Sequence, residues 1–141
     1  GGGIHSKLFQ NVREKASLAY YAFSRLEKFK GLMVVSSGIE IANKDRALEI
    51  ILQQIEEIKA GSITDYEFES TLKTIETSVK SLRDNQLQIV THYLGQSIAS
   101  TNDTFDDLIR KTSQVTKQEV VDVAQKIQLD TIYFLTSKEQ A

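Results

Sequence analysis

The side chains that could do chemistry in this sequence are few and lie far apart. His5 and His92 are the only histidines. A zinc hydrolase helix of the His-x-x-Glu-His type needs two histidines close together to bind one metal ion, and a glutamate between them that activates a water molecule. Neither histidine of this sequence has such neighbours. We expect His5 to be a mobile or weakly bonded ring in a glycine-rich segment and His92 to be a surface or interface residue. Adjacent acidic pairs such as Glu56-Glu57 are typical of solvated helix faces. The sequence therefore predicts no catalytic residue and no metal ligand in this chain.

Composition excludes several further classes of function. The 141 residues include no Cys, which excludes disulfides, thiolate nucleophiles and Cys-based zinc sites. The net charge of −2 comes from interspersed acidic and basic residues, so we expect no nucleic-acid partner. No apolar run approaches the ~18 to 20 residues that a membrane span needs, so we expect no membrane partner. The absence of Cys fits a reducing compartment, and we expect a cytoplasmic protein.

The first 23 residues restrict most strongly what the chain can be. Gly1 to Gly3 allow a tight turn and a close approach of the backbone. The aromatic-rich run 18–23 suits a β-strand, so a helix gives way to a strand near Ser17. The helix between them is amphipathic, with apolar side chains that recur at helical spacing, namely Leu8, Phe9, Val12 and Ala16.

Four short motifs follow one another in this segment. They are Gly-Gly-Gly at 1–3, Ser-x-Leu-Phe at 6–9, Val-Arg-Glu at 12–14 and Leu-Ala-Tyr at 18–20. The pattern resembles the C-terminal, non-zinc half-domain of the insulinase-like or pitrilysin zinc metallopeptidases, an inverzincin family that also has inactive, peptidase-like members. The sequence departs from the family pattern at Ser17, where the family more often has a glycine, although serine is common in tight connections.

The resemblance implies a pair of substrate-binding residues, Arg13 and Tyr20. In the family, an arginine and a tyrosine at this spacing contact the peptide near the scissile bond, from the half opposite the zinc ion. Arg offers fixed, always charged donors to a carbonyl or carboxylate group, and Tyr can donate to a carbonyl oxygen whose charge grows during hydrolysis. Without the resemblance, we would expect Arg13 to pair with a carboxylate on the helix surface and Tyr20 to fill the sheet.

Downstream, the sequence predicts a β-hairpin followed by helices. A charged connection at 25–31 leads to a second strand at 32–39, which should pair antiparallel with the first strand. Both strands carry apolar residues on both faces, so we expect the second face to be partly covered by a helix, a neighbouring domain or bound peptide. A strong amphipathic helix at 43–60 follows and ends at Gly61.

Capping signals divide the second half of the chain into further helices. A Thr followed three residues later by Glu forms a capping box that begins a helix, and such pairs occur at Thr64 and Thr116. Thr104 is expected to cap a shorter helix between them. The helix that begins at Thr64 should bend or break at 84–85, and an apolar stripe continues beyond the break to about residue 99.

These elements predict an α+β fold in which an antiparallel sheet packs against helices. The expected order is helix, hairpin, several helices and a final strand at 131–136, which is β-branched and aromatic and should join the hairpin. A chain of 141 residues is expected to form one domain, residues 1–141. The resemblance implies that this domain is the later portion of a half-domain and a fragment of a longer chain.

Two functions follow from the resemblance. The first is one wall of the peptide-binding chamber of a zinc-dependent peptidase, inactive alone because neither Arg13 nor Tyr20 can split a peptide bond without a metal-bound water. The second is a pseudo-peptidase that acts as a structural or interaction subunit without proteolysis. A third hypothesis, independent of the resemblance, is a free-standing α+β domain that binds a small ligand.

The expected partners follow from the same two functions. They are a peptide substrate, and the other half-domain or a paralogous zinc-binding subunit. Zinc would be held by that other half, and the chain itself would bind no cofactor. A partial half-domain should also expose sheet edge and apolar helix faces, through which we expect a homo-oligomer to form.

Overall fold

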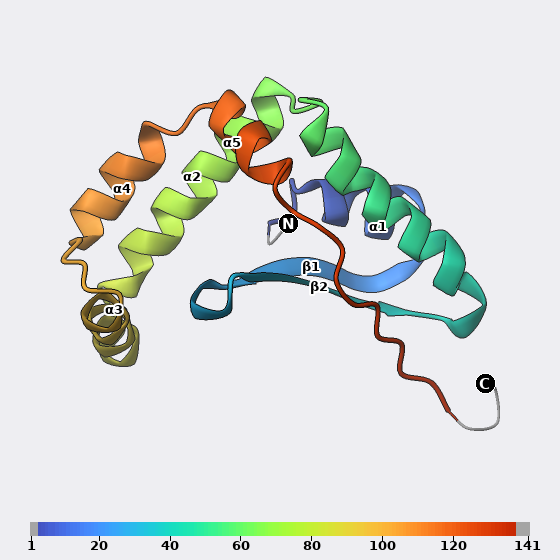
Figure 1. The fold of residues 1–141 in the computed structure, drawn as a ribbon, viewed down its shortest axis with the longest axis horizontal. Coiled ribbons are helices and arrows are strands. Elements are labelled where there is room, and N and C mark those ends of the chain that lie inside the picture. Colours follow the sequence, from blue (N-terminus) through green and yellow to red (C-terminus); the bar gives the residue numbers. More distant parts are fainter. Residues whose placement is uncertain (1–2, 138–141) are drawn as a thin grey trace.

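The computed structural model describes residues 3–137 (Figure 1). Gly1 and Gly2 of the predicted glycine-rich turn lie outside these residues. The prefix η marks a 3-10 helix or, for η1, a π-helix. The elements in chain order are η1 (Phe9–Lys15), β1 (Ala19–Glu27), η2 (Lys28–Lys30), β2 (Leu32–Ile39), η3 (Ile41–Asn43), α1 (Lys44–Lys59), α2 (Asp65–Leu82), α3 (Gln86–Ile98), α4 (Phe105–Ser113) and α5 (Lys117–Ala124).

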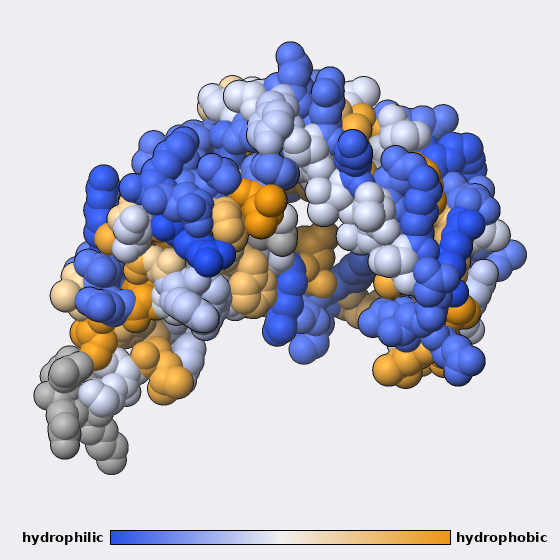
Figure 2. Space-filling view, turned by 180° about the vertical axis from the view of Figure 1, so that it is seen from behind, coloured by the Kyte–Doolittle hydropathy of each residue, from blue (hydrophilic) through white to orange (hydrophobic). Residues whose placement is uncertain are grey.

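The helices form an arch over a two-stranded ribbon. In Figure 1, α1, α5, α2 and α4 follow the curve of the arch, α3 lies end-on at one foot, and the β1–β2 ribbon spans the space beneath. Helix α1 packs against α5 and η1, and α2 packs against α4. Figure 2, seen from behind, shows hydrophilic residues over much of the convex side and hydrophobic residues gathered toward the lower side. The predicted α+β class is confirmed.

The core lies where η1, β1 and α1 meet. Val12 of the predicted apolar stripe is fully buried there. Burying an aliphatic side chain of this kind stabilises the fold by roughly 1.5 to 3 kcal/mol before chain entropy is subtracted. The stripe of the first helix therefore anchors η1 to the ribbon. The buried members of this cluster are Leu8, Val12, Ala22 and Ile50, and the side chains packed around them are Ala16, Leu18, Ala19, Val35 and Ile51.

The ribbon is the predicted antiparallel hairpin. Strand β2 has the predicted bounds, 32–39, and β1 runs beyond its predicted end to Glu27. Arg25 and Glu27 lie on one face of β1 and form an ion pair, with Nε 3.0 Å from Oε1, so these charged residues extend the strand. The connection closes at Gly31, whose φ of 64° belongs to the left-handed region that glycine adopts without strain.

Local sequence signals place the helix ends. Thr64, Thr104 and Thr116 each form a capping box with the acidic residue three positions on, which satisfies two backbone donors at each helix start. Helix α1 ends as predicted before Gly61, which has a φ of 78°, and Asn85 caps α3 after the predicted break. In the described part of the chain, no helix combines the length and the apolar character needed to cross a membrane.

The final strand predicted at 131–136 is wrong for the described residues. The sheet has two strands, β1 and β2, and in Figure 1 the segment after α5 descends in front of the ribbon without joining it. A strand needs a neighbouring backbone about 4.8 Å away, which a β-branched composition cannot supply by itself. Phe134 instead lies beneath the Lys44 ammonium group, which is 5.3 Å from the ring centroid.

Candidate functional site

Tyr20 occupies a β-bulge at the start of β1. Ala19 pairs with Ile39 and Tyr21 pairs with Gly38, so Tyr20 has no partner residue on β2. A bulge bends its strand and redirects side chains, and bulges are frequent next to binding sites. Tyr20 is 87% exposed, which excludes the alternative in which its ring fills the sheet. Its ring and hydroxyl group are available to a ligand.

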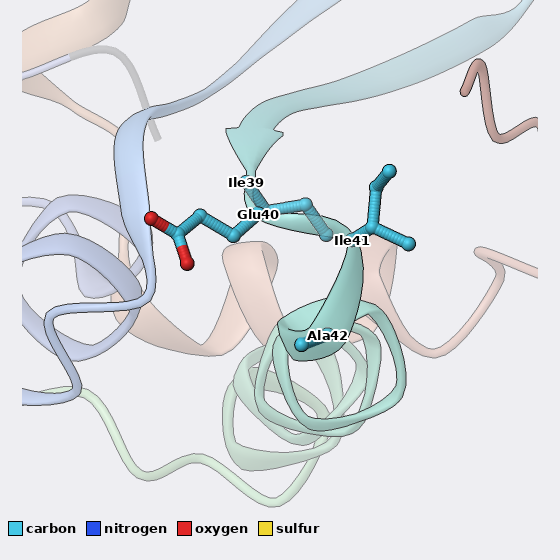
Figure 3. Close-up of a pocket in the computed structure, with 4 residues that line it drawn as sticks. All are labelled: Ile39, Glu40, Ile41 and Ala42. Atoms are coloured by element: carbon cyan, nitrogen blue, oxygen red, sulfur yellow. The ribbon is translucent and has the colours of Figure 1, made fainter. Parts of the chain in front are cut away.

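An open hollow lies at the end of the ribbon that carries Tyr20. One part, of about 670 Å³, is lined by residues 17–21, 38–40 and Asn43. A second part, of about 430 Å³, shares Ile39 and Glu40 with the first and extends to Ala42. Figure 3 shows the Glu40 carboxylate pointing away from α1 and toward the segment where β1 begins. Glu40 is the one charged residue among the described residues that line either part.

Arg13 lies on η1 and is held by its own helix. Its guanidinium carbon is 4.6 Å from the centroid of the Phe9 ring, and its Nε is 3.8 Å from Oε1 of Glu14. This long, partly exposed ion pair agrees with the carboxylate pairing expected from the residues alone, but pairs of this kind contribute little free energy. The Phe9 contact keeps the guanidinium group at the surface, where most of its five N–H donors stay available.

Ser17 connects η1 to β1 in a left-handed conformation, with a φ of 50°. The helix closes with the wide spacing of a π-helix, because the Ala16 N–H donates to the carbonyl oxygen of Asn11, five residues earlier, over 3.2 Å. Glycine has no Cβ and adopts positive φ without a clash, which gives a physical reason for the glycine in the family pattern that this segment resembles. The turn sets the direction in which β1, and Tyr20 with it, leaves η1.

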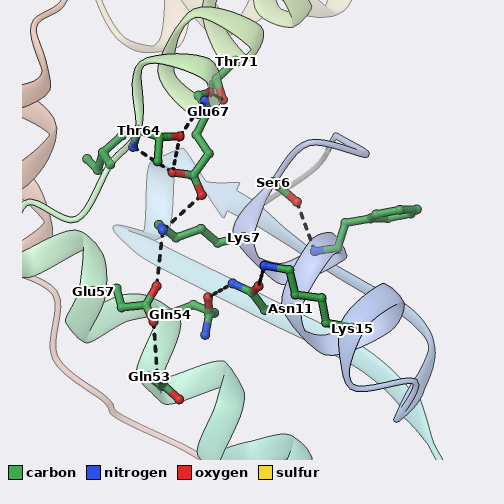
Figure 4. Close-up of polar contacts among 12 residues, drawn as sticks. Ser6, Lys7, Asn11, Lys15, Gln53, Gln54, Glu57, Thr64, Glu67 and Thr71 are labelled. Carbon is green, nitrogen blue, oxygen red and sulfur yellow. Dashed lines mark hydrogen bonds and ion pairs between the residues drawn. The ribbon is translucent and has the colours of Figure 1, made fainter.

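Lys7 attaches η1 to two of the arch helices (Figure 4). Its Nζ lies 3.2 Å from Oε2 of Glu57 on α1 and 3.1 Å from Oε1 of Glu67 on α2. The Lys7 side chain is only 14% exposed, so its charge needs these partners. Burial alone would raise the pKa of Glu67, but hydrogen bonds from the Thr64 N–H, Lys7 and the Thr64 hydroxyl outweigh burial and lower that pKa below its ordinary value.

Asn11 attaches the same helix to α1 by a second polar contact, also drawn in Figure 4. Its amide nitrogen donates to the side-chain oxygen of Gln54, and the Gln54 amide donates to the Ile50 carbonyl oxygen over 3.0 Å. Gln54 is buried, and a buried amide must find such partners to be stable. Lys7 and Asn11 together hold η1 in one orientation, and η1 in turn positions Arg13 and the start of β1.

The structure places Arg13 and Tyr20 on consecutive elements but does not bring them into contact. In the described part of the chain, Arg13 contacts Phe9 and Glu14, whereas Tyr20 lines the hollow. Sequence reasoning missed Lys7 and Glu40. Two signals in the sequence could have indicated them. Lys7 lies within the Ser-x-Leu-Phe motif, and Glu40 comes directly after the second strand.

The two histidines lie in separate polar contacts. Nδ1 of His5 is 2.9 Å from the Tyr66 hydroxyl oxygen, so the expectation of a weakly bonded ring is wrong. Nε2 of His92 is 2.9 Å from the Asp103 carbonyl oxygen, and its ring packs on Phe105 with centroids 4.4 Å apart. Within residues 3–137, no three His, Cys, Asp or Glu residues gather closely enough to hold a metal ion. The described donor set therefore does not fit a zinc site.

A comparison with known families accounts for the motifs of the first elements. Residues 1–75 match the family described as the peptidase M16 inactive domain. The chain belongs to the peptidase M16 family. The matched part contains η1, the ribbon, α1 and the start of α2, so Arg13, Tyr20 and the hollow all lie within it. This confirms the resemblance to the non-zinc half of insulinase-like peptidases.

Individual relatives of this M16 chain are considerably longer. It is 42% identical, over its whole length, to the probable inactive metalloprotease YmfF of Bacillus subtilis, and it covers 33% of that protein. It is 29% identical over 132 residues, 90% of the chain, to the uncharacterized zinc protease SCO5738 of Streptomyces coelicolor, and it covers 28% of that protein. The crystal structure of a conserved protein from Enterococcus faecalis matches with a TM-score of 0.80 and 36% identity, over 89% of this chain and 30% of that one. The chain thus spans about a third of the length of these relatives.

Proposed function

We propose that residues 1–141 form a single domain that is one wall of a peptide-binding chamber in a larger M16 protein and contacts peptide without cleaving it. The observation that carries this proposal is Tyr20, which stands on a bulge, is exposed and lines an open hollow. A tyrosine hydroxyl can donate to the carbonyl oxygen of a peptide bond, and this hydrogen bond strengthens as negative charge grows on that oxygen.

Arg13 is the second contact in this proposal. Its planar guanidinium group is suited to a peptide carbonyl oxygen or a terminal carboxylate, and its ion pair with Glu14, at 3.8 Å, is weak enough to be exchanged for a ligand. Because η1 is held to α1 and α2 by Lys7 and Asn11, Arg13 would approach the peptide from a fixed position. Fixed donors lower the barrier more effectively than mobile ones.

The metal chemistry would come from outside this chain. The proposal assigns zinc to an upstream half-domain or a paralogous subunit that carries a His-x-x-Glu-His helix, which could make the complete protein a zinc-dependent endopeptidase. It also includes a cytoplasmic location, which the lack of Cys supports. Within such an assembly, this chain would bind and orient the peptide on the face opposite the metal ion.

A pseudo-peptidase is the second candidate function, and one observation favours it. The relative that is 42% identical to this chain over its whole length is named a probable inactive metalloprotease. In that case the same wall would serve an interaction or assembly subunit that holds a polypeptide and does not cut it. The exposed apolar side chains of α3 and the free ribbon edges would then contribute to oligomer contacts.

The test measures peptide binding and cleavage by the full-length polypeptide in which these residues occur, together with its partner subunit where one co-purifies. The variants are Arg13→Ala and Tyr20→Phe, and the matched controls are Arg46→Ala and Tyr133→Phe, at exposed positions outside the hollow. For an active parent we expect each site variant to lower kcat/KM by about tenfold, or ~1.4 kcal/mol of transition-state stabilisation. The controls should leave it unchanged.

The outcomes separate the two candidates. Cleavage that a chelator abolishes and that both site variants reduce supports a working wall of a zinc peptidase. Peptide binding that both variants weaken, with no cleavage in the presence of added zinc, supports the pseudo-peptidase. Binding and cleavage as strong in both site variants as in the wild type would contradict the peptide-binding wall in either form.

A further inference from the structure

Glu40 carries a negative charge that no basic side chain of residues 3–137 neutralises by a direct ion pair. The basic residue nearest in sequence, Lys44, places its ammonium group over the Phe134 ring, 5.3 Å from the centroid. Lys15 on η1, the helix before β1, donates to Asn11 instead. An exposed carboxylate is commonly satisfied by water alone, so the surroundings of Glu40 decide whether its charge can recognise a ligand.

Those surroundings form a site with a defined position. Glu40 belongs to both parts of the hollow, and Figure 3 shows its carboxylate directed toward the start of β1 and away from α1. The neighbouring wall residues Ile39, Ile41 and Leu18 are apolar. The hollow is open to solvent and Glu40 is exposed, so water would screen part of an ion pair with Glu40, and a second contact is needed for selectivity.

Tyr20 provides an aromatic face in the same hollow. Because it stands on the bulge, its ring is not covered by a cross-strand neighbour. An exposed tyrosine ring attracts cations over its face, and the planar guanidinium group of arginine both stacks on such a ring and pairs with a carboxylate through two N–H donors. Lysine can also approach a ring face, as Lys44 does at Phe134, but it is a single point charge that cannot stack as a plane or offer a carboxylate two donors in a fixed geometry.

We infer that the hollow is a subsite for an arginine side chain of an extended peptide, in which Glu40 pairs with the guanidinium group and Tyr20 stacks on it. This inference rests on the proposed peptide-binding function and adds a side-chain preference to it. Ser17 and Asn43, the remaining polar side chains of the hollow other than Tyr21, are placed to bond the peptide backbone. Glu40 is then a specificity residue and takes no part in bond cleavage.

The experiment compares arginine with citrulline, its neutral analogue of nearly the same shape. Fluorescently labelled peptides of Ser and Ala carry one Arg, moved through successive positions, and a second set carries citrulline instead. Their affinities for the full-length polypeptide are measured by fluorescence anisotropy. At one peptide position we expect the Arg peptide to bind about fivefold more tightly than the citrulline peptide, because only arginine forms the partly exposed ion pair and the cation–π contact. We expect this ratio of affinities to fall in high salt.

Variants assign the preference to particular groups. Glu40→Gln should remove the arginine preference and leave the affinity for the citrulline peptides unchanged, whereas Asp45→Asn, at an exposed acidic residue outside the hollow, should preserve it. Tyr20→Phe should also preserve it, because the ring remains while the hydroxyl group of the proposed function is lost. Glu40→Lys should reverse it, so that a glutamate at the same peptide position binds more tightly than arginine.

The inference and the proposed function can fail separately. If the peptides bind but Arg and citrulline are equivalent at every position, the arginine subsite is overturned and the peptide-binding wall stands. If an arginine preference exists but survives in Glu40→Gln, the charge that recognises it lies elsewhere and the inference is again overturned. If no peptide of either set binds, both the subsite and the proposed function are overturned.

Discussion

The ring of Tyr21 lies over the backbone of Gly38 on the neighbouring strand. A Cβ atom on Gly38 would stand 2.4 Å from Cε1 and 2.9 Å from Cδ1 of Tyr21. The two residues are register partners directly after the bulge at Tyr20, and glycine in a strand commonly marks such a close approach. The missing side chain at position 38 therefore determines where the Tyr21 ring lies, and both residues line the hollow.

We expect Gly38→Ala to lower the free energy of unfolding by about 1 to 3 kcal/mol, because the added methyl group must displace the Tyr21 ring. Urea denaturation followed by circular dichroism measures the change. In a Tyr21→Ala background the same substitution should be neutral or slightly stabilising, since alanine loses less backbone entropy than glycine on folding. An equal loss of stability in both backgrounds would show that the ring is not the cause.

Ser17→Gly should stabilise the protein by about 0.5 to 1 kcal/mol. Ser17 holds a φ of 50°, which strains a residue that has a Cβ, and its hydroxyl makes only a long contact of 3.4 Å to the Glu14 carbonyl oxygen. The increase should appear as a higher urea midpoint. Ser97→Gly, within α3, is the matched control and should destabilise by a similar amount. A loss of stability from Ser17→Gly would contradict the assigned backbone strain.

The sequence predicted the elements whose determinants are local. The caps at Thr64 and Thr116, the break before Asn85 and the bounds of β2 all depend on residues within one turn or one hairpin. The segment 131–136 has an equally clear strand composition but no ladder, because pairing depends on a backbone that its own residues do not supply.

The candidate site was predicted only in part for the same reason. The motifs indicated Tyr20 by its position. Its exposure, however, follows from a bulge, which forms because β1 has one more residue than β2 at this point of the register. Lys7 meets Glu57 and Glu67 across 50 or more sequence positions, so no local spacing could reveal the contact. The hollow beside Glu40 likewise exists only after the end of β2 returns beside the start of β1.

Stability should decrease in acid through Glu67. Its pKa in the folded protein is lower than the ordinary 4.5, because hydrogen bonds from Thr64 and Lys7 outweigh the opposing effect of burial. The unfolded chain therefore binds more protons as the pH falls below about 4.5, so the contribution of Glu67 is fully present above that pH and is lost as the pH falls through the folded pKa. Urea midpoints measured over a pH series should show this decline.

The variant that tests this assignment is Glu67→Gln. We expect it to reduce stability at neutral pH and to flatten the decline below pH ~4.5, whereas Glu69→Gln, at an exposed position on the same helix, should change neither. Some acid sensitivity should remain, because hydrogen bonds from Arg110 and Thr104 also lower the pKa of Asp107. An unchanged pH profile in Glu67→Gln would contradict the roles given to the Thr64 and Lys7 contacts.

The apolar stripe of α3 should make the 141-residue chain associate when it is produced alone. No residue of α3 carries a formal charge, and four large apolar side chains on it are 58 to 72% exposed, namely Leu87, Val90, Leu94 and Ile98. Contiguous exposed apolar surface of this kind drives association between copies. We expect sedimentation velocity over a dilution series to show a concentration-dependent dimer or larger species.

Lysines on that stripe should reverse the association. In Leu87→Lys/Leu94→Lys the added charges repel a second copy but cost the exposed helix little, because lysine has a helix propensity close to that of leucine. Gln88→Lys, at an exposed polar position of the same helix, is the control and should associate as the wild type does. If association persists unchanged in the double variant, the contact between copies is not made by α3, and the ribbon edges become the expected contact. A wild-type chain that is monomeric at every concentration would exclude association through either α3 or the ribbon edges.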